Sequence, residues 1–117
     1  LLIDEFSGKE VYVFVDEQPS YEGGTMALMT YLIENINLKQ EDVNNCTRFS
    51  FTLQFIVDVD GSVIFPRILK VKESDLTIWE KRMLESLKNI PKWSWSPGKC
   101  KGQAVPVLIT MPLNIRP

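Results

Sequence analysis

The stretch from Phe49 to Asp58 alternates between apolar and polar residues, and no other feature of the chain constrains its fold as strongly. A period of two with polar partners predicts a β-strand with one buried face. The apolar residues that share this face are Phe49, Phe51, Leu53, Phe55 and Val57. The opposite face carries Ser50, Thr52, Gln54 and Asp58. The strand is therefore expected in a sheet that is covered on one side.

A hairpin is predicted directly after this strand. The sequence Asp58-Val59-Asp60-Gly61 is typical of a tight turn, because glycine takes a positive φ without strain. The return strand is predicted over Val63–Val71. Its alternation slips near Pro66, where proline has no amide to give to a ladder. The slip and the proline together predict a β-bulge on an edge strand.

Two segments have the periodicity of amphipathic helices. The first is predicted from Met26 to Asn37, with Thr25 as its cap, and the second follows caps at Ser74 and Asp75. The second helix is expected to end at Pro91, because proline cannot continue a helix. The inward face of the first carries Leu28, Tyr31, Leu32, Asn35 and Ile36. That of the second carries Leu76, Trp79, Met83, Leu84, Leu87 and Ile90.

Shorter strands are predicted near both ends of the chain. Val11–Val15 is rich in β-branched and aromatic residues, and Val105–Met111 forms the last strand, limited by Pro112. Proline and glycine predict a loop over Asp16–Gly24. We also expect a loop over Trp93–Gly102 and a polar connector over Lys39–Thr47.

The resulting order, β-α-β-β-α-β, predicts an α+β two-layer sandwich with two helices packed on a small, mainly antiparallel sheet. The right-handed crossover rule places Phe49–Asp58 in the centre, antiparallel to both neighbours. The last strand then keeps one open side. We divide the chain into an N-terminal extension, residues 1–10, and one domain, residues 11–117.

Composition excludes several function classes. The 117 residues carry a net charge of −2, which argues against a nucleic-acid partner. There is no histidine, the usual general base and the commonest metal ligand, and two cysteines cannot build a zinc cluster. An enzyme would need a carboxylate pair or an activated cysteine, but Asp58 and Asp60 belong to the turn and neither cysteine has an obvious base. We therefore expect no catalytic residue, no metal and no cofactor.

The start of the chain bears on localisation. No apolar run reaches the ~20 residues that cross a bilayer. The first residues lack the basic and apolar regions of a signal peptide. Because the chain begins with leucine, we expect a processed or excised piece whose anchor is missing.

A set of motifs runs through the chain in a fixed order. They are Pro19-Ser20-Tyr21-Glu22-Gly23-Gly24, Glu34-Asn35-Ile36, Val57-Asp58-Val59-Asp60-Gly61-Ser62-Val63, Pro91-Lys92-Trp93-Ser94-Trp95-Ser96-Pro97-Gly98-Lys99 with Gly102, and Met111-Pro112-Leu113-Asn114-Ile115. In this order and spacing the chain resembles the C-terminal domain of TonB, in the form common in Bacteroidetes. The resemblance covers residues 11–115. Its most specific part is the aromatic-x-aromatic-x-Pro-Gly-Lys stretch followed by a strand.

The resemblance implies a noncatalytic periplasmic domain, anchored to the inner membrane by a segment outside this chain. Such a domain couples inner-membrane energy to nutrient import by pairing a short receptor segment, the TonB box, with an exposed sheet edge. The implied partners are TonB-dependent outer-membrane receptors, and inner-membrane motor proteins reached through preceding parts. The rival hypothesis is the same fold as a noncatalytic sensory or interaction module of another periplasmic or membrane-bound protein.

The last strand is the predicted partner site, because an edge strand offers unpaired N–H and C=O groups to an added strand. Its residues are Val107, Leu108, Ile109, Thr110 and Met111. The preceding loop is predicted to flank the site with Trp93, Trp95, Pro97, Gly98, Lys99 and Gly102. The edge that carries Pro66 is blunted. An open edge also pairs with itself, so a homodimer stays open.

Several of these residues have a second interpretation. Trp93 and Trp95 either form a surface platform or close one end of the core. Gly23-Gly24 favours a tight turn over a phosphate site, and Asp58 with Asp60 favours a turn over a calcium site. The lysines of the loop region either lie in solvent or steer an acidic segment, and they are Lys92, Lys99 and Lys101.

The two cysteines are predicted to be free thiols. Cys46 precedes the central strand and Cys100 precedes its antiparallel neighbour, so they fall at opposite ends of the sheet. Such ends lie ~30 Å apart, against the ~5.5 Å between Cα atoms that a disulfide needs.

Overall fold

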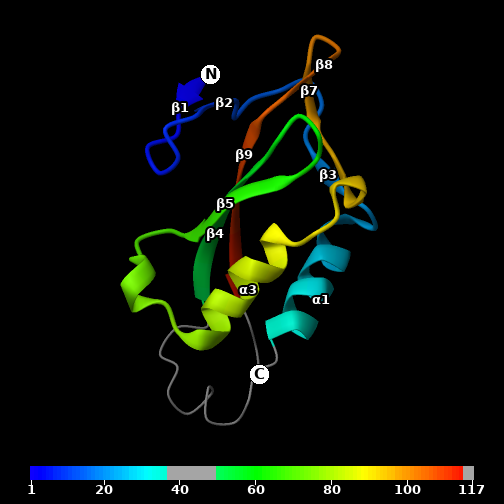
Figure 1. Cartoon of the computed structure of the whole chain (residues 1–117). Helices are drawn as coiled ribbons and strands as arrows, with labels where there is room; N and C mark the ends of the chain where they lie inside the picture. The colour runs from blue at the N-terminus through cyan, green and yellow to red at the C-terminus, as the bar shows by residue number, and fades with distance from the viewer. Residues whose placement is uncertain (37–49, 115–117) are drawn as a thin grey trace.

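The central sheet has three antiparallel strands in the order β5-β4-β9 (Figure 1). The computed structural model describes residues 1–36 and 50–114. Strand β4 spans Ser50–Val57, β5 spans Val63–Ile68 and β9 spans Val107–Asn114. The strand predicted over Phe49–Asp58 corresponds to β4. Its predicted central position, between the two strands that follow it in the sequence, is confirmed. The α+β class is confirmed as well.

The hairpin between β4 and β5 has the predicted turn and the predicted bulge. The Gly61 amide donates to the Asp58 carbonyl at 2.9 Å, and Gly61 has a φ of 87°. Gln54 pairs with Arg67, but Ile56 pairs with Ile64, so two residues of β5 stand opposite Phe55. This is the extra residue of a β-bulge.

Two helices cover one face of the sheet. Helix α1 spans Gly24–Ile36 and α3 spans Ile78–Lys88. The predicted caps are wrong for both. Thr25 lies inside α1, whose first residue, Gly24, has a positive φ, as does Gly23 before it. Helix α3 is capped by Thr77, because Ser74 and Asp75 belong to a preceding 3₁₀ turn, η1, at Glu73–Asp75.

The core lies between the helices and the odd-numbered residues of β4. Phe51, Leu53, Phe55 and Val57 are buried there, as their alternation predicts. The helices contribute Leu28, Leu32, Trp79, Met83 and Leu87. The rings of Phe51 and Trp79 lie 5.9 Å apart between centroids. Phe49, Asn37 and the predicted connector lie outside the described residues.

The predicted first strand is wrong over most of its length. Strand β1, Leu2–Ile3, pairs with β2, Glu10–Val11, and the chain bends away after Tyr12. Val11 is fully buried, whereas Phe14 is 90% exposed. High β-propensity did not extend the strand, because propensity in a sheet reflects packing against neighbours.

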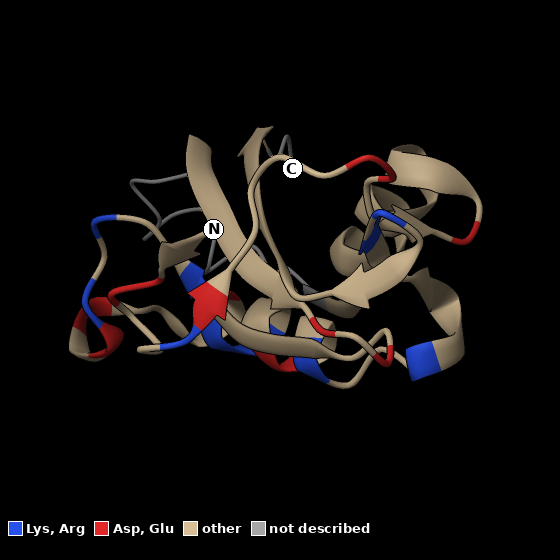
Figure 2. Cartoon of the chain, turned by 90° about the horizontal axis from the view of Figure 1, so that it is seen from above, with Lys and Arg blue, Asp and Glu red and all other residues tan. Residues whose placement is uncertain are grey.

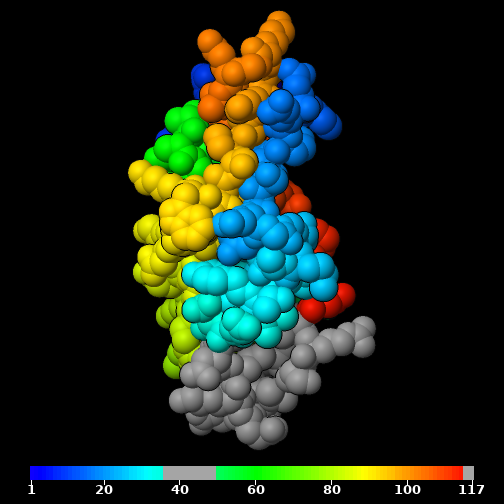
Figure 3. Space-filling model, turned by 90° about the vertical axis from the view of Figure 1, so that its right-hand side faces the viewer, coloured from blue at the N-terminus to red at the C-terminus, as the bar shows by residue number. Residues whose placement is uncertain are grey.

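The predicted loop over 93–102 is instead organised into short strands. A 3₁₀ turn, η2, spans Lys92–Ser94, and β6, Trp95–Ser96, pairs with β3, Ser20–Tyr21. Strands β7, Gly98–Cys100, and β8, Gln103–Val105, form a hairpin. The hairpin (orange) projects at one end of the molecule (Figure 3).

Candidate functional site

The outer edge of β9 is the candidate site. Strand β9 pairs with β4 on one side only, in the register Val57↔Val107 to Ser50↔Asn114. Successive residues of an antiparallel strand direct their backbone groups to alternate sides. The Leu108 amide donates outward, to the Tyr12 carbonyl at 2.9 Å. Thr110, Pro112 and Asn114 therefore also direct their backbone groups outward, away from β4.

This alternation explains how β9 continues past Pro112. The prediction that Pro112 limits the strand is wrong, because the proline stands opposite Thr52 and the strand runs on to Asn114. An outward-facing proline removes no hydrogen bond from the ladder with β4. It does remove one amide that an added strand would use. Pro112 therefore shortens the useful edge without interrupting the sheet.

Thr110 is the outward-facing amide between these two obstructed positions. No strand in the described part of the chain pairs with it on that side. Its side chain lies on the open face of the sheet, where Gln54 Nε2 donates to Thr110 Oγ1 at 2.9 Å. Ser50 and Asn114 make a similar contact farther along β9. The open edge is thus centred on Thr110, with polar side chains beside it.

The beginning of the edge is covered by the N-terminal segment. We call residues Leu2–Tyr12 the strap. The Tyr12 amide donates to the Pro106 carbonyl at 2.9 Å and the Leu108 amide donates to the Tyr12 carbonyl, so Tyr12 forms a parallel bridge to β9. Of the predicted edge residues, Val107 and Leu108 are therefore covered by the chain itself.

A buried ion pair holds the strap to the sheet. The Asp4 carboxylate contacts the Arg67 guanidinium at 2.5 Å, and these two residues are 5% and 8% exposed. Arg67 also donates to Gln54 Oε1 and to the Phe65 carbonyl. Burial raises the pKa of Asp4, but hydrogen bonds from Ser7 and the charge of Arg67 outweigh it, so this pKa is lowered overall. Asp4 is therefore a charged anchor.

The strap lies on the face of the sheet opposite the helices. Ile56 points to that face and is nevertheless fully buried. A shallow cavity on this side is lined by strap residues, by Gln54 and Arg67, and by Leu108. The Phe6 ring lies over the Arg67 guanidinium, 4.9 Å from ring centroid to carbon. Strap residues within the predicted N-terminal extension, residues 1–10, are thus packed against the domain.

The predicted flanking residues have different environments. Trp93 is 76% exposed in η2 and can serve as a platform, but Trp95 is buried and packs against Phe55 and Tyr21. The structure therefore assigns Trp95 to the core, whereas the role of Trp93 as a platform stays a prediction. The Trp95 indole N–H has no hydrogen-bond partner among the described residues. Trp95 belongs to the core and cannot contact a partner directly.

Gly98 is also a packing residue. A Cβ built on it would lie 2.5 Å from Val107 Cγ2 and 3.1 Å from Pro19. The glycine therefore lets the β7–β8 hairpin pack closely on the start of β9. Lys99 pairs with Glu17 through backbone hydrogen bonds at 2.9 and 3.1 Å and is exposed. Gly102, at the tip of the hairpin, is exposed, and Pro97 is half-buried.

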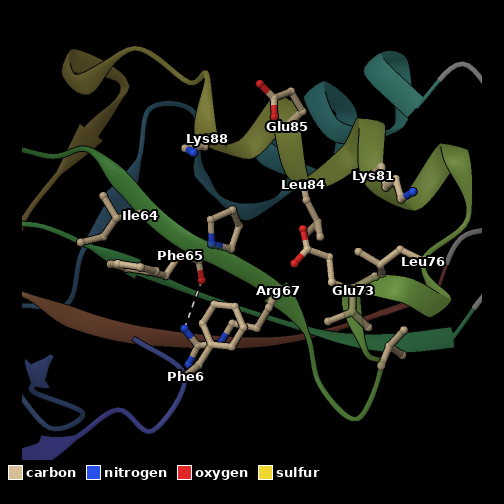
Figure 4. Close-up of a pocket in the computed structure, with 13 residues that line it drawn as sticks. Phe6, Ile64, Phe65, Arg67, Glu73, Leu76, Lys81, Leu84, Glu85 and Lys88 are labelled. Atoms are coloured by element: carbon tan, nitrogen blue, oxygen red, sulfur yellow. Dashed lines mark hydrogen bonds between the residues drawn. The ribbon is translucent and has the colours of Figure 1, made fainter. Parts of the chain in front are cut away.

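A second cavity, of about 520 Å³, lies between β5 and α3 (Figure 4). Leu84, Lys81 and Lys88 line it from the helix, and Phe65 and Arg67 from the strand. Phe6 of the strap lines it from below. Phe65 has a φ of 52° in the bulge, which makes β5 irregular at this point. The irregularity supports the prediction that this edge is a poor template for an added strand.

The two aspartates of the β4–β5 turn, Asp58 and Asp60, interact with neighbouring residues of the protein. Asp58 accepts from the Val59 amide, and Asp60 accepts from Ser62 and contacts Lys92 at 2.9 Å. Ser62 and Lys92 hold the pKa of the exposed Asp60 well below its usual range.

Basic and acidic positions are interspersed over the fold (Figure 2). Among the described residues there is no group of three or more His, Cys, Asp or Glu that could hold a metal ion.

The predictions about the two cysteines and about membrane-spanning segments can be compared with the described residues only. Cys100 is a free, half-buried cysteine, whereas Cys46 lies outside the described residues, so the prediction about their pairing stays a prediction. Within residues 1–36 and 50–114, no helix is both long and apolar enough to cross a membrane.

The sequence pattern does not predict the strap or its anchor. Asp4 and Arg67 are far apart in the sequence, and no local pattern joins them. A weak signal was present, since Arg67 stands among apolar residues of a strand that was predicted to lie at an edge.

Comparison with known proteins gives no relative for this chain: no family model, no curated protein and no solved structure matches it.

Proposed function

We propose that this chain is a noncatalytic interaction domain of the TonB C-terminal type, which binds outer-membrane receptors by accepting a strand at β9. In this role it acts in the periplasm and couples inner-membrane energy to nutrient import. The observation that carries the proposal is the open outer side of β9 around Thr110. The motif resemblance supplies the class of partner.

The local chemistry supports strand addition. Main-chain hydrogen bonds supply affinity in this mode, and side chains at alternate positions supply specificity. Thr110 offers an N–H and a C=O in succession, and Leu108 and Pro112 offer carbonyl groups on the same side. The side chains of Gln54 and Thr110 provide a polar surface beside the added strand.

A proline substitution at Thr110 tests strand addition, because it removes a single backbone N–H group. Thr110→Pro removes the free outward amide and leaves the ladder with β4 intact, as the natural Pro112 does. We expect it to lower the affinity for a receptor segment at least ~10-fold, since a hydrogen bond and a steric fit are lost together. Thr110→Val is the matched control. It removes the hydroxyl that accepts from Gln54 but keeps the amide, and we expect a change of ~2-fold or less.

The measurement is fluorescence anisotropy with labelled peptides that carry the N-terminal segments of TonB-dependent receptors. Circular dichroism and thermal unfolding of each variant establish that the fold is kept. The proposal is wrong if a folded Thr110→Pro protein binds these peptides as tightly as the parent chain does. It is also wrong if the parent chain binds none of them.

A further inference from the structure

The strap makes with β9 the contacts that an added strand would make. The Tyr12 amide donates to the carbonyl of Pro106, just before β9, and the Tyr12 carbonyl accepts from the Leu108 amide in β9, each at 2.9 Å. Leu108 carries the first outward amide of β9, two residues before Thr110. A partner strand that used both amides would have to displace Tyr12. The strap and such a partner therefore exclude each other at Leu108.

The attachment of the strap is concentrated in few contacts. Strands β1 and β2 have two residues each, and the loop between them closes through Asp4–Lys9 and Gly8–Asp4 backbone bonds at 2.8 and 2.7 Å. Beyond Tyr12, the polar link to the sheet is the ion pair of Asp4 with Arg67. Phe6 adds a contact over Arg67 and an edge-on contact with Phe65 at 6.4 Å. Leu2, Ile3 and Phe6 are 43%, 57% and 62% exposed.

Elements with few buried apolar contacts open locally before the whole domain unfolds. The strap fits this description, because Val11 is its one fully buried apolar residue and the Asp4–Arg67 pair is its buried polar anchor. Its opening would free the Leu108 amide and lengthen the docking edge from one free amide to two. Its closing would leave Thr110 alone.

We propose that the strap is a displaceable latch that competes with the partner strand for the Leu108 end of β9. This inference rests on the proposed function, since it assigns to the same edge a closed and an open state. When the strap is closed, a partner must displace it in order to bind, and this displacement lowers the apparent affinity of the partner. Weakening the latch therefore tightens partner binding.

The test loosens the anchor without touching β9. In Asp4→Ala the carboxylate that holds Arg67 is lost. Glu5→Ala is the matched control, because Glu5 is the next strap residue, carries the same charge and is exposed. Amide exchange followed by NMR reports on the latch without any partner. We expect the Leu108 amide to exchange at least ~10-fold faster in Asp4→Ala, with little change in Glu5→Ala.

The inward amides of Ile109 and Met111 report whether the whole domain opens instead. They are expected to keep their exchange rates in Asp4→Ala. If Asp4→Ala accelerates all three amides equally, Tyr12→Pro replaces it, since that variant removes only the bond from the strap to the Pro106 carbonyl. Selective acceleration at Leu108 in Tyr12→Pro supports the latch, and unchanged or uniform exchange there overturns it.

Binding of the receptor peptides completes the test. In Asp4→Ala the dissociation constant is expected to fall ~3–10-fold, and in Glu5→Ala to stay within ~2-fold. Faster exchange at Leu108 with unchanged affinity overturns the competition between strap and partner. If no peptide binds either protein, the proposed function fails. In that case the exchange rate of Leu108 still decides whether the strap opens independently.

Discussion

At the scale of single residues, the buried Asp4–Arg67 pair predicts a large effect of substitution on the stability of the fold. Both side chains are almost completely buried, and Arg67 has two further hydrogen-bond acceptors, Gln54 Oε1 and the Phe65 carbonyl. Removing one partner of a buried pair leaves a charge without compensation, which costs ~3–5 kcal/mol in other proteins. Because Arg67 keeps other acceptors, we expect Asp4→Asn to lie at the lower end of this range.

The same residue predicts a pH dependence. The pKa of Asp4 is lowered from 3.8 in the folded state, so its stabilisation is complete above 3.8 and is lost as the pH falls through the lower folded value. Denaturant unfolding from pH 6 to pH 2 should therefore show a difference between parent and Asp4→Asn that shrinks as the pH falls below about 4. A difference that stays constant across this range would contradict a charged Asp4.

At the scale of elements, the start of α3 depends on a capping box. The Glu80 amide donates to Thr77 Oγ1, and the Thr77 amide donates to Glu80 Oε1 at 2.8 Å. We expect Thr77→Ala to lower the free energy of unfolding by ~1 kcal/mol. Thr30→Ala is the control, because Thr30 is exposed within α1 and only returns its hydroxyl to the Met26 carbonyl. Equal losses in the two variants, measured by chemical denaturation, would show that the cap contributes nothing.

The outer edge of strand β9 has two features that limit strand pairing. Leu108 is covered by Tyr12, Pro112 has no amide, and Thr110 lies between them. Proteins protect edge strands from uncontrolled pairing with prolines and with covering segments. Both devices are present on β9, at positions that spare Thr110. Under the proposed function, β9 would therefore admit a short added strand and disfavour a long one.

At the scale of the whole molecule, this protection bears on self-association. Pro112→Val would add an outward amide next to Thr110, so two β9 edges could pair antiparallel around a two-fold axis. Each protomer gains one hydrogen bond worth ~1 kcal/mol, which predicts at least ~10-fold tighter self-association in sedimentation velocity experiments. The double variant Pro112→Val with Thr110→Pro should lose this gain. Association that persists in the double variant would mean that the chain dimerises through another surface.

Local pattern was sufficient for the elements that the core requires. The alternation of β4, the Asp58–Gly61 turn and the bulge at Pro66 were predicted, because each depends on periodicity or on the backbone of one residue. The central position of β4 followed from chain connectivity. Even the missed cap of α3 had a local signal, since Thr77 and Glu80 have the spacing of a capping box.

Tertiary contacts decided the rest. Val13–Val15 have the residues of a strand, but the chain there turns toward β7 and has no edge to pair with. Trp93 and Trp95 are each followed by a serine, so their local sequences are alike. Only Trp95 faces the ring of Phe55 and is buried. The strap joins Asp4 to Arg67 and Tyr12 to Leu108 across long stretches of chain. Sequence alone determined which strand has an open edge, because patterning and connectivity set the order of strands. How much of that edge is free depends on distant residues brought together by folding, and no local pattern encodes such contacts.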